Sequence, residues 1–147
     1  MDMDQSLERF GLAPDPADLP ETRQILEAAS EAESEEQGEG DTELMRLCCA
    51  QLFIAGHVED SLLIWRAKSA SMDAACSIDV QLLFGAGLAE TIDFLKAVAS
   101  DSAGGALQKI QSCRSHGDFD HFSVKTMGED LVRYYADWQW LAFKLAK

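Results

Sequence analysis

The sequence predicts an all-α protein, a compact irregular bundle of about six helices arranged as helical hairpins and preceded by an acidic N-terminal arm. Three observations predict this fold class. Apolar residues recur at spacings of three and four along most of the chain, which is the spacing of one face of an α-helix. No segment alternates apolar and polar residues as a half-buried strand does. The connections between helical segments are short, which favours antiparallel neighbouring helices.

The charge of the 147-residue chain is divided unequally between two parts. The whole chain has 26 acidic and 12 basic side chains, a net charge of −14, and residues 1–43 hold 14 of the acids with only Arg9 and Arg23 as bases. We therefore predict that residues 1–43 form an acidic arm that adds little to the core, and that residues 44–147 form a helical domain. An acidic arm repels phosphate, which argues against a nucleic acid or an anionic membrane as the partner.

One short helix followed by a linker is expected in the arm. Pro16 interrupts any helix that precedes it, and the spacing of Asp18 and Glu21 is that of a capping box, so the helix runs to about Ala32. The segment 30–41, SEAESEEQGEGD, has the composition of a charged linker. The predicted partner-binding carboxylates of the arm are Glu31, Glu33, Glu35 and Glu36.

Six helical segments are predicted after the linker. They cover residues 42–55, 58–70, 72–84, 88–100, 106–116 and 126 to the C-terminus. Gly56 and Gly85 follow helices as stop signals, and Thr126 with Glu129 has capping-box spacing for the last helix. The last helix carries an apolar stripe of Met127, Leu131, Tyr134, Trp138, Leu141 and Leu145. A helical repeat array is the alternative architecture, but no signature residues recur at a fixed period, so we favour the compact bundle.

The helix predicted at residues 72–84 carries acidic residues on an otherwise apolar surface. On a helical wheel, Asp73 and Asp79 flank a stripe centred on Cys76, which predicts two buried or half-buried carboxylates that need partners. The predicted polar network consists of Trp65, Arg66, Lys68, Asp73, Asp79 and Gln81. Two interpretations stay open: ion pairs that fix the order of the helices, or a polar pocket for a ligand or a partner's basic side chain.

A second polar cluster lies just before the last helix. It consists of His116, Asp118, Asp120 and His121, which are weak candidates for metal ligands. The string differs by one residue from a motif of metallo-β-lactamase-type hydrolases, but it lies between helices in a domain too short for that fold. A helix stop at Gly117 followed by an Asp-rich turn explains the same residues. We therefore predict no metal site and no cofactor.

The four cysteines, Cys48, Cys49, Cys76 and Cys113, show no CxxC spacing and lie in helical, mostly apolar segments. Because we find no export signal and no apolar run long enough for a membrane span, we expect reduced, buried thiols in a cytoplasmic protein. A nucleophilic Cys76 would need a base and an electropositive setting, and Asp79 provides neither. No catalytic residue is predicted, and an enzyme is the less favoured class.

Residues 62–95 contain three short elements in series: W-R-A-K at 65–68, D-x-x-C-x-I-D-x-Q at 73–81 and G-A-G at 85–87. Through these elements, residues 44–95 resemble a recurrent segment of small uncharacterised bacterial all-helical proteins. The resemblance implies a bacterial source and a helical fold, and it implies no activity.

Two functions are consistent with these observations. The preferred one is a protein-interaction module, such as an immunity protein or an antitoxin-like regulator, whose acidic arm engages another protein, possibly a basic one. The alternative is a small-ligand-binding or minor enzymatic domain that uses a polar pocket around Asp73 and Asp79. The sequence does not determine an oligomeric state.

Overall fold

The computed structural model describes residues 1–145, without the side chains of residues 140–143. Within that part, the regular elements are eight α-helices and two 3₁₀ segments, with no strand. In chain order they are α1 (Met3–Phe10), η1 (Pro16–Asp18), α2 (Leu19–Glu35), α3 (Thr42–Ala55), α4 (Asp60–Lys68), α5 (Met72–Ser77), η2 (Val80–Phe84), α6 (Leu88–Val98), α7 (Asp101–Ser115) and α8 (Val124–Leu145). The all-α class is thus confirmed, whereas the count of about six helices is not.

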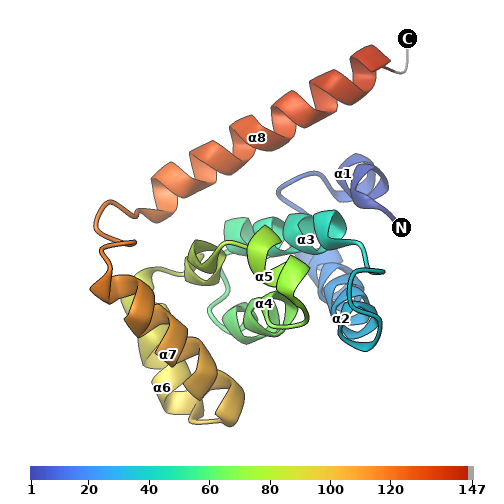
Figure 1. Cartoon of the computed structure of the whole chain (residues 1–147). Helices are drawn as coiled ribbons and strands as arrows, with labels where there is room; N and C mark the ends of the chain where they lie inside the picture. Colours follow the sequence, from blue (N-terminus) through green and yellow to red (C-terminus); the bar gives the residue numbers. More distant parts are fainter. Residues whose placement is uncertain (146–147) are drawn as a thin grey trace.

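The core is built around α3, which lies in the middle of the molecule (Figure 1). Residues 44–53 include a single basic side chain and are otherwise almost entirely apolar, and a helix that is apolar nearly all round is buried on all sides. Both predicted ends of this helix are confirmed. The Asp41 carboxylate accepts a hydrogen bond from the Leu44 N–H at 3.0 Å, and Gly56 ends the helix with a left-handed φ of 77°.

The acidic N-terminal segment, residues 1–43, packs against this core and does not form a separate arm. Leu7 of α1 and Leu26 of α2 are buried in the same apolar cluster as α3. Gln51 of α3 donates hydrogen bonds to the Ser6 hydroxyl at 3.2 Å and to the Gly11 carbonyl at 2.8 Å. The expectation that residues 1–43 add little to the core is therefore wrong, because a few well-spaced apolar side chains are enough to bury two helices.

The helix predicted at residues 72–84 is broken in the middle. α5 ends at Ser77, Ile78 and Asp79 take extended backbone conformations, and η2 follows. The Lys68 ammonium donates to the carbonyl oxygens of Ala75 and Ile78, both at 2.6 Å, and so satisfies the end of α5. The wheel drawn through a continuous helix therefore has the wrong phase after residue 77. In consequence, Ile78 is fully buried, and Met72, at the start of α5, is exposed although the wheel placed it on the apolar stripe.

η2 approaches the α3 backbone closely where the chain turns toward α6. A Cβ placed on Gly85 would lie 2.6 Å from the Phe53 carbonyl oxygen and 2.9 Å from the Phe53 Cα. This contact is possible only for glycine, because every other residue would push η2 away from α3. Leu82, Leu83 and Phe84 are thereby held in the core.

The bounds of the last three helices differ from the predicted ones. α6 ends at Val98, two residues earlier than predicted, and α7 and α8 each begin earlier than predicted. α7 starts at Asp101, because the Ser100 hydroxyl accepts a hydrogen bond from the Ala103 N–H at 3.1 Å. α8 starts at Val124, because the Ser123 hydroxyl accepts from the Thr126 N–H at 3.0 Å. The capping box predicted at Thr126 is therefore wrong. Both corrections come from serine residues that cap helices without the glutamate of a full capping box.

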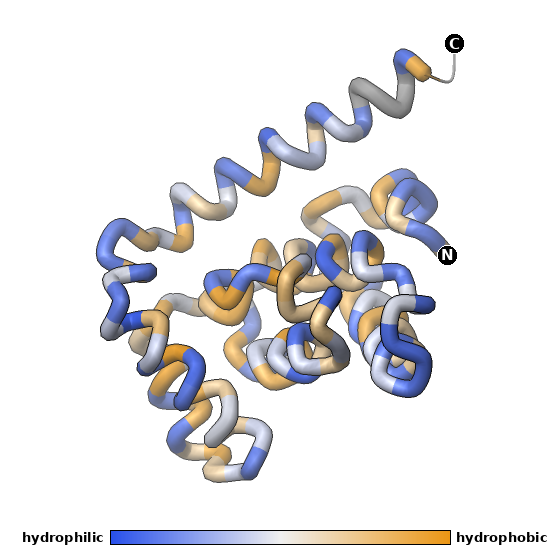
Figure 2. The backbone as a smooth tube through the Cα atoms, viewed as in Figure 1, coloured by the Kyte–Doolittle hydropathy of each residue, from blue (hydrophilic) through white to orange (hydrophobic). Residues whose placement is uncertain are grey.

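α8 runs across the body and extends beyond it (Figure 1). Figure 2 shows hydrophobic residues gathered in the middle of the body, whereas polar and apolar residues are mixed along α8. Leu131 and Tyr135 are buried, and the Trp138 indole donates to the Asp4 carboxylate at 2.8 Å. The predicted stripe is thus buried only in part: Tyr134 and Leu145 are exposed, and Leu141 lies outside the described side chains.

Candidate functional site

The predicted polar network is divided among separate places in the structure. Lys68, the last residue of α4, is buried and its side chain reaches the end of α5. Asp73 is exposed beside Gly38 in the turn after α2. Trp65 and Arg66 line a hollow that faces α2, whereas Asp79 and Gln81 line a different hollow beneath α8. The sequence therefore identified residues that border hollows, but it grouped into one site residues that belong to two.

Lys68 has a structural role in this arrangement. Its ammonium binds two backbone carbonyl oxygens, and the described part of the chain gives it no ion pair with Asp73 or Asp79. Burial lowers the pKa of the Lys68 ammonium, and the neighbouring charge of Lys109 acts in the same direction. The interpretation that Lys68 fixes the order of the helices is therefore supported for this residue, through carbonyl groups and not through a carboxylate.

Asp79 has a partner that the sequence did not suggest. Its carboxylate lies 3.8 Å from the Arg46 guanidinium of α3, and its side chain is 54% exposed. Arg46 in turn lies over the ring of Tyr134 of α8, 4.8 Å from the ring centroid. The prediction of a buried Asp79 paired with Trp65, Arg66 or Lys68 is wrong. Arg46 could have been found as the single base in an otherwise apolar helix.

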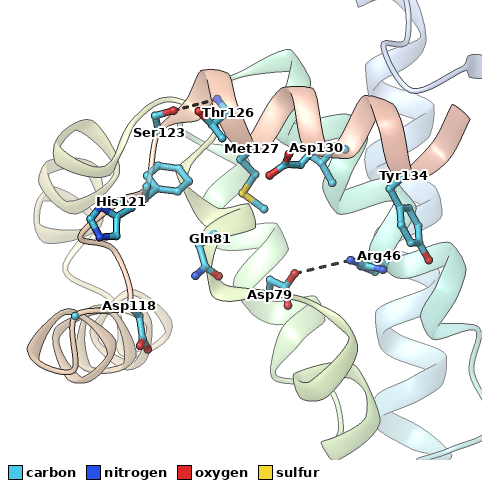
Figure 3. Close-up of a pocket in the computed structure, with 13 residues that line it drawn as sticks. Arg46, Asp79, Gln81, Asp118, His121, Ser123, Thr126, Met127, Asp130 and Tyr134 are labelled. Carbon is cyan, nitrogen blue, oxygen red and sulfur yellow. Dashed lines mark hydrogen bonds and ion pairs between the residues drawn. The ribbon is translucent and has the colours of Figure 1, made fainter. Parts of the chain in front are cut away.

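A cleft of about 660 Å³ lies between η2, α8 and the turn that precedes α8 (Figure 3). In Figure 3, Asp118 and His121 are at one end of this cleft, and Asp79, Arg46 and Tyr134 are toward the other. The lining side chains include Arg46, Asp79, Gln81, Asp118, His121, Phe122, Met127, Asp130, Leu131 and Tyr134. We call this space the α8 cleft.

Aromatic contacts hold the turn before α8 in place at the cleft. The ring of Phe84 in η2 meets Phe119 edge-on at 4.9 Å and Phe122 at 5.5 Å between centroids. Asp118 and His121 alternate with these phenylalanines, so they are brought to the cleft wall. The sequence string around residue 118 is therefore a packed turn that carries polar side chains toward the cleft.

The weak metal candidates do not converge on one point. Among the described residues, no three His, Cys, Asp or Glu side chains come close enough together to hold a metal ion. The His116 imidazole is exposed and its Nδ1 lies 2.7 Å from the Ser112 carbonyl oxygen. Asp120 lies against Gly117, within the turn itself. Only Asp118 and His121 of this cluster line the cleft.

A smaller hollow of about 310 Å³ adjoins the α8 cleft at the other side of Arg46. The two spaces share Arg46, Asp79 and Tyr134 in their walls. The additional lining of the smaller hollow includes Glu43, Cys76, Tyr135 and Trp138. Together the two spaces follow α8 along much of its length.

The acidic surface of α2 borders a third hollow, of about 460 Å³, between α2, α4 and the start of α7. Glu27 and Glu31 lie one turn apart on α2 and face this space with the half-buried Trp65 and the exposed Arg66 of α4. Neither glutamate has an ion-pair partner among the described residues. We call this space the α2 hollow.

Glu33 does not belong to the exposed acidic surface, contrary to prediction. Its side chain is fully buried, and it accepts hydrogen bonds from the Gly38 N–H at 3.0 Å, the Gly40 N–H at 2.7 Å and the Ser71 hydroxyl at 2.7 Å. The hydrogen bonds from Gly38 and Ser71 lower the pKa of this carboxyl. Glu33 therefore fastens the turn after α2 to the start of α5, and cannot contact a partner as the exposed Glu31, Glu35 and Glu36 can.

The cysteines are divided between core and surface. Cys48, Cys49 and Cys113 are buried as predicted, whereas Cys76 is exposed. Burial raises the pKa of the Cys48 thiol to about 12, and that of Cys49 well above its ordinary value. Since a thiolate is the reactive form, these two residues are packing residues and not nucleophiles.

Comparison with known proteins indicates no function for the α8 cleft, the smaller hollow or the α2 hollow. None of the described helices is long and apolar enough to cross a membrane. The resemblance of residues 44–95 to small bacterial helical proteins stays a prediction. No family model, curated protein or solved structure matches the chain.

Proposed function

We propose that this protein is a protein-interaction module that binds a basic partner through the acidic face of α2, in the manner of a bacterial immunity protein or antitoxin-like regulator. The observation that carries the proposal is the α2 hollow, where Glu27, Glu31 and the Trp65 ring face one space. Two carboxylates beside an indole ring are suited to a lysine or arginine side chain, which gains both charge-assisted hydrogen bonds and a cation–π contact.

The acidic residues of α2 outnumber the bases near them, among which Arg66 of α4 faces the α2 hollow. No basic residue occurs between Arg23 and Arg46, a segment that contains all of α2 after its first turn and the turn that follows it. Arg23 is already engaged, because its guanidinium donates to both carboxylate oxygens of Asp60 at 2.8 and 3.0 Å. A surface with an excess of acidic residues attracts a basic protein over a distance and speeds its association.

The acidic face is also held in shape before binding. The opposite side of α2 is anchored by Leu19 and Leu26, and Glu33 fixes the turn that follows. A partner would therefore bind an ordered helix, and little binding free energy would be lost in ordering it. The predicted binding surface thus lies on a packed helix and not on an arm that adds little to the core.

A photo-reactive amino acid at Ser34, an exposed residue that lines the α2 hollow, tests the proposal in the source cells. We expect it to cross-link a basic protein that the same group at the exposed Gln108 of α7 does not capture.

The association rate of the purified pair should then fall at least fivefold for Glu27→Gln with Glu31→Gln, and fall steeply with salt. The matched control is Asp93→Asn with Glu129→Gln, which removes two exposed charges elsewhere. Equal rates for both double variants would contradict the proposal.

Arg66 provides a second, opposite test. It lines the α2 hollow without an ion pair to a described residue, so it opposes a basic side chain that enters the hollow. Arg66→Gln should tighten binding of the basic partner by about twofold, since a repulsion of about 0.4 kcal/mol is removed at a solvated surface. Weaker binding would mean that Arg66 contacts an acidic group of the partner.

The α8 cleft favours a second candidate function, the binding of a small molecule. Asp79 and Gln81 line this cleft with Arg46 and Tyr134, so polar groups converge on a concave space with apolar walls. Asp73, the other acid predicted for such a pocket, lies elsewhere. Native mass spectrometry of the protein purified from its source tests this candidate: a retained small molecule should be lost in Asp79→Asn, and retention by that variant would contradict it.

A further inference from the structure

The α8 cleft and the smaller hollow beside it share part of their walls. Their volumes are about 660 and 310 Å³, and Arg46, Asp79 and Tyr134 stand at the junction between them. The Asp79 carboxylate is half exposed at this junction, and its distance of 3.8 Å from Arg46 leaves its oxygens open to a second donor. An elongated ligand that spans both spaces would therefore pass Asp79 near its middle.

Carboxylates are distributed along this space and favour a cation. Asp118 lies at one end of the α8 cleft, Asp79 at the junction and Glu43 in the smaller hollow. Among the described residues, neither Asp118 nor Glu43 has an ion-pair partner. Asp130 also lines the cleft, but it is paired with Arg133. An anionic ligand would face repulsion along the whole length.

The positive groups at the space do not offset these carboxylates. Arg46 is the base that lines both hollows, and its guanidinium is held over the Tyr134 ring at 4.8 Å. His121 lines the end of the cleft next to Asp118. Asp118 and Glu43 are unpaired and Asp79 has one partner at 3.8 Å, so the carboxylates outnumber the single arginine, and the charge of the lining is complementary to a ligand that carries several positive charges.

Apolar and aromatic side chains separate the carboxylates. Phe122, Met127 and Leu131 line the α8 cleft, and Tyr135 and Trp138 line the smaller hollow. Such walls suit methylene groups, and the half-buried rings of Phe122 and Trp138 suit ammonium groups. A hydrated metal ion would gain nothing from these walls.

We propose that this double hollow binds a linear aliphatic polyamine, with one ammonium group at Asp79 and others toward Asp118 and Glu43. A lysine side chain offers the same alkylammonium chemistry but only one charge, so it would use one of the three carboxylates. The inference rests on the second candidate function, ligand binding in the α8 cleft, and it does not involve the α2 hollow, which shares no lining residue with either space.

Isothermal titration calorimetry of the whole chain with spermidine tests the proposal. We expect spermidine to bind at least tenfold more tightly than n-butylamine or Nα-acetyl-lysine amide, which each carry one ammonium group. Asp79→Asn should weaken spermidine binding at least tenfold, and Asp118→Asn should weaken it severalfold, with unchanged thermal melts. Equal affinity for the lysine amide would assign the site to a lysine side chain and overturn the polyamine.

Two controls separate a built site from general attraction to an acidic protein. Glu27→Gln with Glu31→Gln removes two charges from the α2 hollow and should leave spermidine affinity within twofold. Mg²⁺ at the concentration of spermidine should not displace it. Equal loss in the α2 variant, or displacement by Mg²⁺, would overturn the proposal. If native mass spectrometry finds another molecule that depends on Asp79, ligand binding in the cleft stands and the polyamine does not.

Discussion

The N-terminal acidic segment and the C-terminal helix α8 both rest on α3, but they are attached to it in different ways. Leu26 of α2 is completely buried, and Arg23 and Glu33 add internal polar contacts on either side of it. α8 is longer, yet its described attachments are mainly Leu131, Tyr135 and the indole of Trp138. The segment with the higher charge is thus the better integrated.

This difference shows that charge density is a poor guide to packing. A helix needs one apolar row toward its neighbour, and α2 supplies it although most of its other positions are acidic or small. α8 has more large apolar side chains, but Val132 and Tyr134 of this set are exposed. The space left beside α8 is where the α8 cleft and the smaller hollow form.

Truncation of an apolar side chain, buried in α2 and exposed in α8, should give the largest difference. Leu26→Ala in α2 should lower the free energy of unfolding by about 3 kcal/mol, because a fully buried leucine leaves a cavity. Val132→Ala in α8, where the side chain is 54% exposed, should cost less than about 0.5 kcal/mol. Urea unfolding followed by circular dichroism measures both. Similar costs would mean that α8 is as firmly packed as α2.

Breaking an ion pair should also lower the free energy of unfolding more in the N-terminal segment than in α8. Asp60→Ala should cost about 2 kcal/mol, because it leaves Arg23 without the bidentate partner whose side chain is only 7% exposed. Asp130→Ala breaks the solvent-exposed pair with Arg133 on α8 and should cost less than about 0.5 kcal/mol. Double-mutant cycles in urea measure the two coupling energies. A coupling energy near zero for Arg23 and Asp60 would refute the expected order.

As the pH is lowered, the N-terminal segment should be destabilised at a higher pH than α8. The folded-state pKa of Glu33 lies below the ordinary value of 4.5, so its contribution is complete above about pH 4.5 and is lost as the pH falls through the lowered value. Melting temperatures between pH 6 and pH 3 should therefore fall less for Glu33→Gln than for the unchanged protein. Glu35→Gln, an exposed change in the same helix, should keep the full pH dependence. A parallel fall in Glu33→Gln would exclude this carboxyl as the cause.

A small effect is also expected where the two regions touch. Trp138→Phe removes the indole N–H that donates to Asp4 and keeps an aromatic ring, and it should cost about 0.5 kcal/mol, since this hydrogen bond is exposed to water. Amide hydrogen exchange should be faster in α8 and unchanged in α2. Faster exchange in α2 as well would show that the two regions open together.

The parts of the fold that could be predicted are those with local signals. The ends of α3 follow from Asp41 and Gly56, which act on their own helix. The break after Ser77 could not be predicted, because it depends on the Lys68 ammonium reaching carbonyl groups from a different helix. α1 was missed although it has a local signal, the capping box of Asp2 with Gln5 at its start. What could not be predicted is its attachment to the body, because Gln51 lies 45 residues away from Ser6.

The residues of the candidate site were also predicted only in part. Asp79 and Gln81 do line a cleft, but the wheel gave them the wrong neighbours because it assumed one continuous helix. Arg46 and Tyr134 are 33 and 55 residues from Asp79, and nothing in the local pattern joins them to it. Acidic residues of similar appearance also had opposite roles: Glu31 faces a hollow, whereas Glu33 is an internal acceptor.

The contact between Gly85 and Phe53 limits how this protein can change over time. Substitutions at the hollows alter solvated side chains and can accumulate singly, but any side chain at position 85 meets the α3 backbone at 2.6 Å. Descendants of this sequence that bind other partners should therefore differ around α2 and α8 while glycine persists at position 85. A lineage that lost this glycine would have to move η2, and with it the cleft wall that carries Gln81.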